Sequence, residues 1–269
     1  MSQHSEEEDG FAGDLFGAES EEDTPQIVPT FEHYIRDNAK DGNHKELKIR
    51  LVGSHPLWAH HLWNASKVFA SLFDKHPRLV QDKYILELGA GGALPSLISV
   101  LNGAAKVVVT DYPDAELIDN IKHNVDHNTP NLPIIVEGYI WGTATDCLRS
   151  HLPEGKQTYD VLILSDLVFN HSQHHAMLKT CRELLTPKTG RVYVFYTHHR
   201  PHLAHRDLQF FDIAQRPVRN DVDNEDRELL GYGFKADHFM IQKMGVMFEE
   251  DPGDEEVRAT VHGWQLWLE

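Results

Sequence analysis

The sequence has little cysteine, few basic residues and no long apolar run. Only two of its 269 residues, Cys147 and Cys181, are cysteines. This number is too small for a disulfide framework and favours a reducing compartment. No apolar run approaches the roughly 18–20 residues that a membrane-spanning helix needs, and the acidic N-terminus lacks the pattern of a signal or transit peptide. These absences predict a globular protein of the cytoplasm that does not interact with membranes.

The charge balance excludes two further classes of partner. The chain has 25 Lys and Arg against 42 Asp and Glu, for a net charge of −17. Residues 1–30 carry −9 of it and contain no Lys or Arg, so residues 31–269 carry −8. Nucleic-acid backbones and anionic lipids are bound through basic patches, and we expect neither as a partner. A basic protein or peptide suits this charge.

The composition divides the chain into a tail and one domain. Residues 1–30 have few large apolar side chains and cannot bury enough surface to offset their ordering entropy, so we expect an acidic disordered tail. The remaining 31–269 are long enough for one large domain. Within it we expect an N-terminal strand and helix extension over 31–75 and a catalytic core over 76–269.

Strands and helices alternate through most of this domain. An alternating strand at 46–52 and a helix at 57–73 come first, followed by short apolar strands separated by helices. The expected strands are 84–88, 106–110, 132–136, 159–164 and 191–196, and the expected helices are 94–101, 114–128, 173–185 and 203–215. Short apolar strands between helices are typical of a parallel sheet that is covered on both faces. Segments 234–247 and 257–268, separated by an acidic turn at 249–256, predict an antiparallel hairpin at the sheet edge.

A glycine-rich turn follows the first strand of the core, in the stretch Glu87-Leu-Gly89-Ala-Gly91-Gly92-Ala-Leu94-Pro95. Such a turn lets a ligand approach the backbone closely, although a purely structural turn is the alternative. Leu94 stands where the dinucleotide fingerprint has its third glycine, which argues against NAD. A carboxylate at Glu87 would repel a pyrophosphate, and it fits a cationic amino-acid ligand better.

Polar and aromatic residues follow the next strands, where an open parallel sheet binds ligands. Asp111 ends the second strand and is placed to accept hydrogen bonds from ribose hydroxyls; a helix cap is the alternative. Trp141 follows the third strand and could stack on adenine, or pack in the core. Ser165 could bind the cofactor and Asp166 could face the substrate, with a helix cap again the alternative.

The sequence contains 19 histidines, several of them clustered. The pairs His171/His175 and His198/His202 have the i,i+4 spacing that could bind a metal on a helix. No HExxH motif is present and no cysteine lies close by, so we expect no metal. The loop Thr197-His-His-Arg-Pro201 follows the fifth strand and is either a substrate contact or a solvated loop.

Taken together, these residues resemble the seven-strand S-adenosylmethionine-dependent methyltransferases, and more narrowly the methyltransferase-like lysine methyltransferase group. Within that group the sequence is similar to the fungal N-terminal and lysine methyltransferases of translation elongation factor 1-alpha, formerly called nicotinamide N-methyltransferase-like. The stretches that carry the resemblance are 50–65, Leu86–Ser96, Val109–Asp114, Trp141-Gly142, Leu164–His171 and Thr197–Pro201. The resemblance implies an α/β Rossmann-like fold with a mostly parallel sheet, a C-terminal antiparallel hairpin and helices on both faces.

The resemblance also assigns roles to particular positions. Residues expected to bind S-adenosyl-L-methionine are Trp63, Gly89, Ala90, Gly91, Asp111, Trp141 and Ser165. Many relatives have a small apolar residue at the position of Ser165, so its hydroxyl is not required by the family pattern. Asp166, with support from Asn170 and His171, is expected to position the substrate amine, and a neutral histidine could take its proton.

The implied reaction is methylation of the N-terminal α-amine and an adjacent lysine of elongation factor 1-alpha by a monomeric enzyme. A small-molecule, nicotinamide-like amine is the alternative substrate. An NAD-dependent oxidoreductase and a non-catalytic binding module are two further alternatives, disfavoured by Leu94 and by the intact motif residues respectively.

Overall fold

The computed structural model describes residues 28–39, 44–53, 55–219 and 230–269. All but the last three residues of the expected acidic tail lie outside these ranges. In the described part of the chain no helix is both long and apolar enough to cross a membrane.

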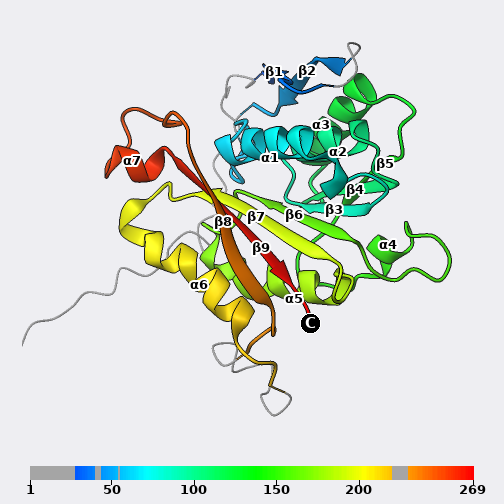
Figure 1. Cartoon of the computed structure of the whole chain (residues 1–269). Coiled ribbons are helices and arrows are strands. Elements are labelled where there is room, and N and C mark those ends of the chain that lie inside the picture. The colour runs from blue at the N-terminus through cyan, green and yellow to red at the C-terminus, as the bar shows by residue number, and fades with distance from the viewer. Residues whose placement is uncertain (1–27, 40–43, 54, 220–229) are drawn as a thin grey trace, which may run out of the picture.

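A seven-strand sheet in the order β5-β4-β3-β6-β7-β9-β8 forms the centre of the molecule (Figure 1). The first five strands are parallel, and β9 pairs antiparallel with both β7 and β8. This arrangement confirms the predicted parallel sheet with a C-terminal hairpin. The strands are β3 (Tyr84–Leu88), β4 (Lys106–Asp111), β5 (Ile134–Gly138), β6 (Val161–Ser165), β7 (Arg191–Thr197), β8 (Lys235–Lys243) and β9 (Thr260–Trp267).

Helices cover both faces of this sheet because neighbouring residues of its strands point to opposite sides. Ile85 belongs to the apolar cluster beneath α1, α2 and α3, whereas Leu86 belongs to the cluster beneath α5 and α6 (Figure 1). The helices are α1 (Asn64–Lys75), α2 (Leu94–Leu101), α3 (Ala115–Asn128), α4 (Asp146–Arg149), α5 (His174–Leu184), α6 (Ala204–Gln215) and α7 (Glu255–Arg258), with 3-10 turns η2 (Pro77–Leu79), η3 (His171–Gln173) and η4 (Pro201–Leu203).

The predicted helix at 57–73 is wrong in its first part. Helix α1 begins only at Asn64, and Trp63 is its N-cap in an extended conformation. Trp58 has a left-handed backbone with φ of 61°, and its carbonyl oxygen accepts a hydrogen bond from the indole Nε1 of Trp63 at 3.2 Å. The apolar periodicity predicted a helix from 57, but the left-handed backbone of Trp58 interrupts it, and the local hydrogen bond from Trp63 to Trp58 closes a loop before Asn64.

A second, two-strand sheet at the N-terminus consists of β1 (Thr30–Ile35) and β2 (Glu46–Leu51). Only β2 was predicted. Five of the six residues of β1 are exposed, so it lacks the alternation that indicates a half-buried strand.

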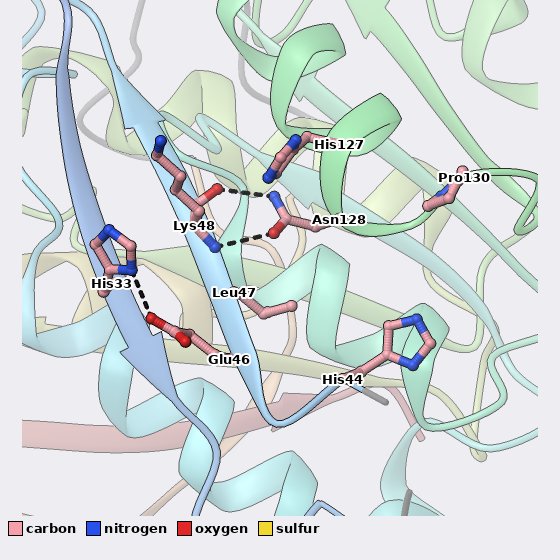
Figure 2. A pocket seen from close by; sticks show the side chains of 8 residues that line it. All are labelled: His33, His44, Glu46, Leu47, Lys48, His127, Asn128 and Pro130. Carbon is pink, nitrogen blue, oxygen red and sulfur yellow. Dashed lines mark hydrogen bonds and ion pairs between the residues drawn. The ribbon is translucent and has the colours of Figure 1, made fainter. Parts of the chain in front are cut away.

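The free edge of β2 is completed by side chains rather than by another strand. Asn124 of α3 accepts a hydrogen bond from the Arg50 amide at 2.7 Å and donates to the Arg50 carbonyl at 2.8 Å. Asn128 makes the same two bonds with the backbone of Lys48, both at 3.0 Å (Figure 2). Both asparagines are buried. Side-chain amides therefore act here as the neighbouring strand.

The spacing of the two asparagines along α3 matches the spacing of Arg50 and Lys48 along β2, which explains why the side chains can pair with the strand backbone. Four residues of a helix advance about 6.0 Å, and two residues of a strand advance about 6.6 Å. Asparagines at i and i+4 of α3 therefore face backbone groups at j and j−2 of β2. Asn124 also donates to the Gly92 carbonyl at 3.2 Å, so the same side chain connects the N-terminal sheet with the glycine-rich turn.

We predict that Asn124→Ala lowers the free energy of unfolding by about 1–3 kcal/mol, because it leaves the Arg50 amide without its acceptor. The Arg50 carbonyl keeps one donor, the side chain of Asn120 at 3.0 Å. Urea denaturation monitored by circular dichroism measures the change. Asp126→Ala, an exposed position on the same helix, is the matched control and should lie within about 0.5 kcal/mol of the wild type. Equal stability of the two variants would contradict the pairing.

Candidate functional site

The carboxyl ends of the parallel strands meet at one edge of the sheet, and most of the predicted site residues lie there. Register pairs align the ends of β3 and β6 and of β6 and β7, as in Leu88 with Leu164 and Ser165 with Phe195. Leu88 and Leu164, 76 positions apart in the sequence, and Ser165 and Phe195, 30 positions apart, therefore become neighbours.

Gly89 and Trp141, which were both predicted to contact the cofactor, lie against each other. Gly89 has a φ of +59°, and a Cβ built on it would lie 2.9 Å from Cζ2 of Trp141 and 2.8 Å from Cδ2 of Leu167. Only glycine fits this position, because the left-handed backbone and the two side chains both exclude a Cβ. The ring of Trp141 thus borders the glycine-rich turn.

Gly91 has open space beside it. Its φ is +52°, and the nearest atom to a built Cβ is Cα of Ala59 at 4.0 Å. Its amide donates to Oδ2 of Asp111 at 2.8 Å, and the Tyr112 amide donates to Oδ1 at 2.7 Å. Ala90 donates its amide to the Thr110 carbonyl at 3.0 Å, which fixes the turn on β4. Burial raises the pKa of Asp111 despite these hydrogen bonds.

Glu87 does not reach outward to a ligand's ammonium group. It is fully buried, and its Oε2 accepts hydrogen bonds from the amide, at 3.0 Å, and from the hydroxyl of Ser96 in α2. Burial is the main cause that raises the pKa of Glu87 to about 8, with a smaller contribution from the charge of Asp111. The residue anchors helix α2 to β3.

Asp166 has a left-handed backbone, as do Ala93 and Trp58 near this edge. It is a buried residue with a φ of +59°, a conformation that costs a non-glycine residue about 1 kcal/mol or more and that clusters at functional sites. Its Oδ1 accepts hydrogen bonds from Nε2 of His199 at 2.9 Å and from the Thr197 amide at 3.3 Å. Within the described residues, Oδ2 of Asp166 and the hydroxyl of Ser165 are buried without a hydrogen-bond partner.

Trp63 reaches the same place from the N-terminal extension. Its ring lies edge-on to the ring of His199, with centroids 4.8 Å apart, and 6.0 Å from the ring of Phe248. Phe248 also packs edge-on against His61 at 4.9 Å. The start of α1, the loop after β7 and the segment after β8 therefore meet around Asp166.

His171 lies in a different cluster from Asp166. Its Nε2 is 2.7 Å from Oδ1 of Asp207 on α6, and Nδ1 of His198 is 2.6 Å from Oδ2 of the same carboxylate. All three side chains are almost completely buried. Asp207 thus binds His171 and His198, two of the histidines considered above as metal ligands. A third, His175, packs against Tyr232.

Two residues of the site were missed from the sequence. His199 was included only as part of the loop Thr197–Pro201, with no role of its own, and Phe248 was not considered. The adjacent histidines 198 and 199 after a strand indicated a polar loop. Which of them faces Asp166 depends on how the strand ends in three dimensions.

An acidic segment borders this cluster. Residues Glu249–Glu256 follow Phe248, and a Cβ built on Gly253 would lie 3.0 Å from the ring of Pro201 in the loop after β7. The Arg258 guanidinium donates to the Phe248 carbonyl at 2.7 Å, which holds the start of the segment. The charge of Asp251 contributes to a raised pKa of His199. The segment therefore gives the rim near His199 a negative potential.

The residues at this edge fit S-adenosylmethionine. The space beside Gly91 is open because glycine has no Cβ, and the carboxylate of Asp111, which accepts a hydrogen bond from the Gly91 amide, borders it. The unpartnered hydroxyl of Ser165 is a buried polar group that a ligand can satisfy. Gly89, Ala90 and Gly91 would then hold the methionine part, Asp111 the ribose and Trp141 the adenine.

We predict that Glu87→Gln changes the pH dependence of stability. Because the pKa of Glu87 is raised to about 8 in the folded protein from about 4.5 in the unfolded chain, its contribution to stability decreases as the pH rises between these values. Raising the pH from 5.5 to 8 should therefore favour Gln over Glu by roughly 1–3 kcal/mol. Urea unfolding of both proteins at the two pH values measures this, and a constant difference would contradict it.

Comparison with known proteins agrees with this geometry. A family model described as lysine methyltransferase matches residues 42–216. A protein N-terminal and lysine N-methyltransferase, EFM7, of Cryptococcus neoformans is 42% identical over 97% of this chain and 90% of its own length. The enzyme of the same name from Schizosaccharomyces pombe is 45% identical over 83% of each chain.

Solved structures are similar in fold. A proposed SAM-dependent methyltransferase from Streptococcus mutans has a TM-score of 0.52 and 11% identity, covering 93% of this chain and 57% of its own. A proposed transferase from Pyrococcus horikoshii has a TM-score of 0.51 and 13% identity, covering 89% and 73%. These two structures share the fold of this chain, and the family model and the relatives show that the chain belongs to the lysine methyltransferase family.

Proposed function

We propose that the protein methylates the N-terminal α-amine and an adjacent lysine of translation elongation factor 1-alpha, in the cytoplasm and as a monomer. The observation that carries the proposal is the buried, left-handed Asp166, which holds His199 through one oxygen and leaves the other without a partner among the described residues. The relatives, which are named N-terminal and lysine N-methyltransferases, support the class of substrate. The elongation factor itself comes from the resemblance of the sequence motifs.

The protonation state of the substrate favours an N-terminal amine. Only a neutral amine has the lone pair that attacks a methyl group. At pH 7 an α-amine with a pKa near 7.7–8.0 costs about 1 kcal/mol to deprotonate, whereas a lysine with a pKa near 10.4 costs about 4–5 kcal/mol. Lysine methylation therefore demands more from the residues that receive the amine.

The chain's own residues orient the reactants. S-adenosylmethionine supplies an electrophilic methyl group on a sulfonium, so alignment provides most of the rate enhancement. The free Oδ2 of Asp166 is placed to accept a hydrogen bond from the incoming amine and so to direct its lone pair. The rings of Trp63 and Phe248 exclude water on the side of the N-terminal extension.

A small-molecule amine is the second candidate, and the rim favours a protein substrate instead. A closed aromatic pocket would suit a nicotinamide-like ring. The acidic stretch that begins at Glu249 lies beside the Trp63 and His199 cluster, and its charge suits the basic tail of a protein.

We predict that two substitutions separate cofactor binding from transfer. Asp111→Ala should weaken S-adenosylmethionine binding by at least about 10-fold, because it removes a charged hydrogen-bond acceptor. Asp166→Asn should leave this affinity within about 2-fold and lower kcat by about 100-fold. Isothermal titration calorimetry and a radiolabel assay measure the two effects. Unchanged affinity in Asp111→Ala would contradict the assigned ribose site, and full turnover of Asp166→Asn would contradict its role with the amine.

We predict that the enzyme labels elongation factor 1-alpha in cell extract when supplied with methyl-labelled S-adenosylmethionine. Mass spectrometry of the labelled band should place methyl groups on the first residue and on a lysine near it. A recombinant elongation factor with an acetylated N-terminus is the matched control, and it should retain only the lysine signal. A labelled small metabolite without any labelled protein would contradict the proposal and favour the second candidate.

A further inference from the structure

We propose that His199 is the proton acceptor for the substrate amine, that Asp166 orients it, and that Asp207 is a positioning residue that holds the two loops together. This inference rests on the proposed function, because it describes how the same site prepares an amine for methylation. No motif in the sequence singles out His199 or Asp207.

The contact between His199 and Asp166 determines which ring nitrogen is available. Nε2 of His199 lies 2.9 Å from Oδ1 of Asp166, so in the neutral imidazole Nε2 carries the proton and donates it to the carboxylate. Nδ1 is then the basic nitrogen. This is how a buried carboxylate fixes a histidine as a general base. Oδ2 of Asp166 stays available for the amine.

The surroundings of His199 stabilise its protonated form. Burial lowers the pKa of His199, but the surrounding carboxylates, Asp166 foremost through its charge and hydrogen bond, together raise the pKa above the ordinary value. The other carboxylates that act on it are Asp207 of α6 and Asp251 of the acidic segment. Trp63 covers the ring from the side of α1 and carries no charge. A base with a raised pKa is matched to an α-amine with a pKa near 7.7–8.0.

Asp207 holds the pair without touching the reacting atoms. One oxygen binds His171, five residues after Asp166, and the other binds His198, directly before His199. The loops after β6 and β7 are therefore attached to the same carboxylate on α6. Each histidine donates one N–H to Asp207, and the buried carboxylate accepts both. The distance between Asp166 and His199 therefore depends on the two hydrogen bonds that Asp207 accepts from His171 and His198.

The proton and electron balance is simple. The ammonium of the substrate, bound at Oδ2 of Asp166, gives one proton through a single bridging water to Nδ1 of His199, which points away from Asp166, and becomes a neutral amine. Its lone pair then forms the new C–N bond while the C–S bond of the donor breaks, and that electron pair stays on sulfur. The methylated nitrogen carries the positive charge, and the imidazolium returns its proton to water when the product leaves.

The test is the pH dependence of His199→Gln on an unacetylated peptide of the elongation factor's first residues. At pH 7 the variant should lose about 100-fold in kcat/KM. At pH 9.5, where the free amine predominates in solution, the loss should shrink to below about 5-fold. Calorimetry should give the same S-adenosylmethionine affinity as the wild type. A loss of equal size at both pH values would overturn the assignment as proton acceptor, since a merely structural role is not relieved by a higher pH.

His205→Gln is the matched control, because this histidine is exposed and lies on α6 near the same edge. It should follow the wild-type profile at every pH. If wild-type enzyme transfers no methyl group to the peptide, the proposed function fails, and the inference about His199 is then decided by a second measurement.

That measurement is the NMR titration of the histidine ring protons in the full chain, which needs no peptide. The pKa of His199 should fall in Asp166→Asn and, by a smaller amount, in Asp207→Asn, and it should stay unchanged in His205→Gln. A pKa of His199 that is insensitive to Asp166→Asn would overturn the pairing.

Discussion

The parallel register of five strands is the constraint on which the rest of the structure depends. Neighbouring strands pair the polar backbone groups, and helices cover both faces, so most side chains within the strands are apolar. The buried exceptions, Glu87 and Thr110, are hydrogen-bonded inside the fold. Most other polar side chains of the sheet therefore gather where the strands end. Gly89, Asp111, Trp141 and Asp166 all follow strand ends, and the register carries them to one edge.

The N-terminal extension matters because it covers that edge. Strand β2 is attached to the core by asparagine side chains of α3, and Asn124 joins it to Gly92 of the glycine-rich turn. Trp63, at the start of α1, then contacts His199. Residues of the N-terminal extension, 31–75, therefore lie against the residues at the sheet edge. The expected division of the domain at residue 75 follows the order of the sequence, whereas in the structure the two parts pack together.

The carboxylates near this edge are each held by different partners. Hydrogen bonds from the Thr197 amide and from His199 stabilise Asp166 in its left-handed conformation. The carboxylate of Asp207 accepts hydrogen bonds from two buried histidines, His171 and His198. Glu87, by contrast, keeps a proton to near neutral pH because burial disfavours its charge. The pKa of Glu87 is thus raised and that of Asp207 lowered because their neighbours differ.

The sequence by itself determined the sheet, its C-terminal hairpin, the glycine-rich turn and the family, because short apolar strands and turn glycines are local signals. It also placed Trp141 after the third strand and Asp166 at the end of the fourth, and only the structure showed that Trp141 borders Gly89. The tertiary structure decided the rest. It made Trp63 an N-cap rather than a helix interior, gave His171 to Asp207, turned Glu87 inward and selected His199 as the partner of Asp166. These outcomes depend on which side chains meet across distant segments, and no local periodicity encodes such contacts.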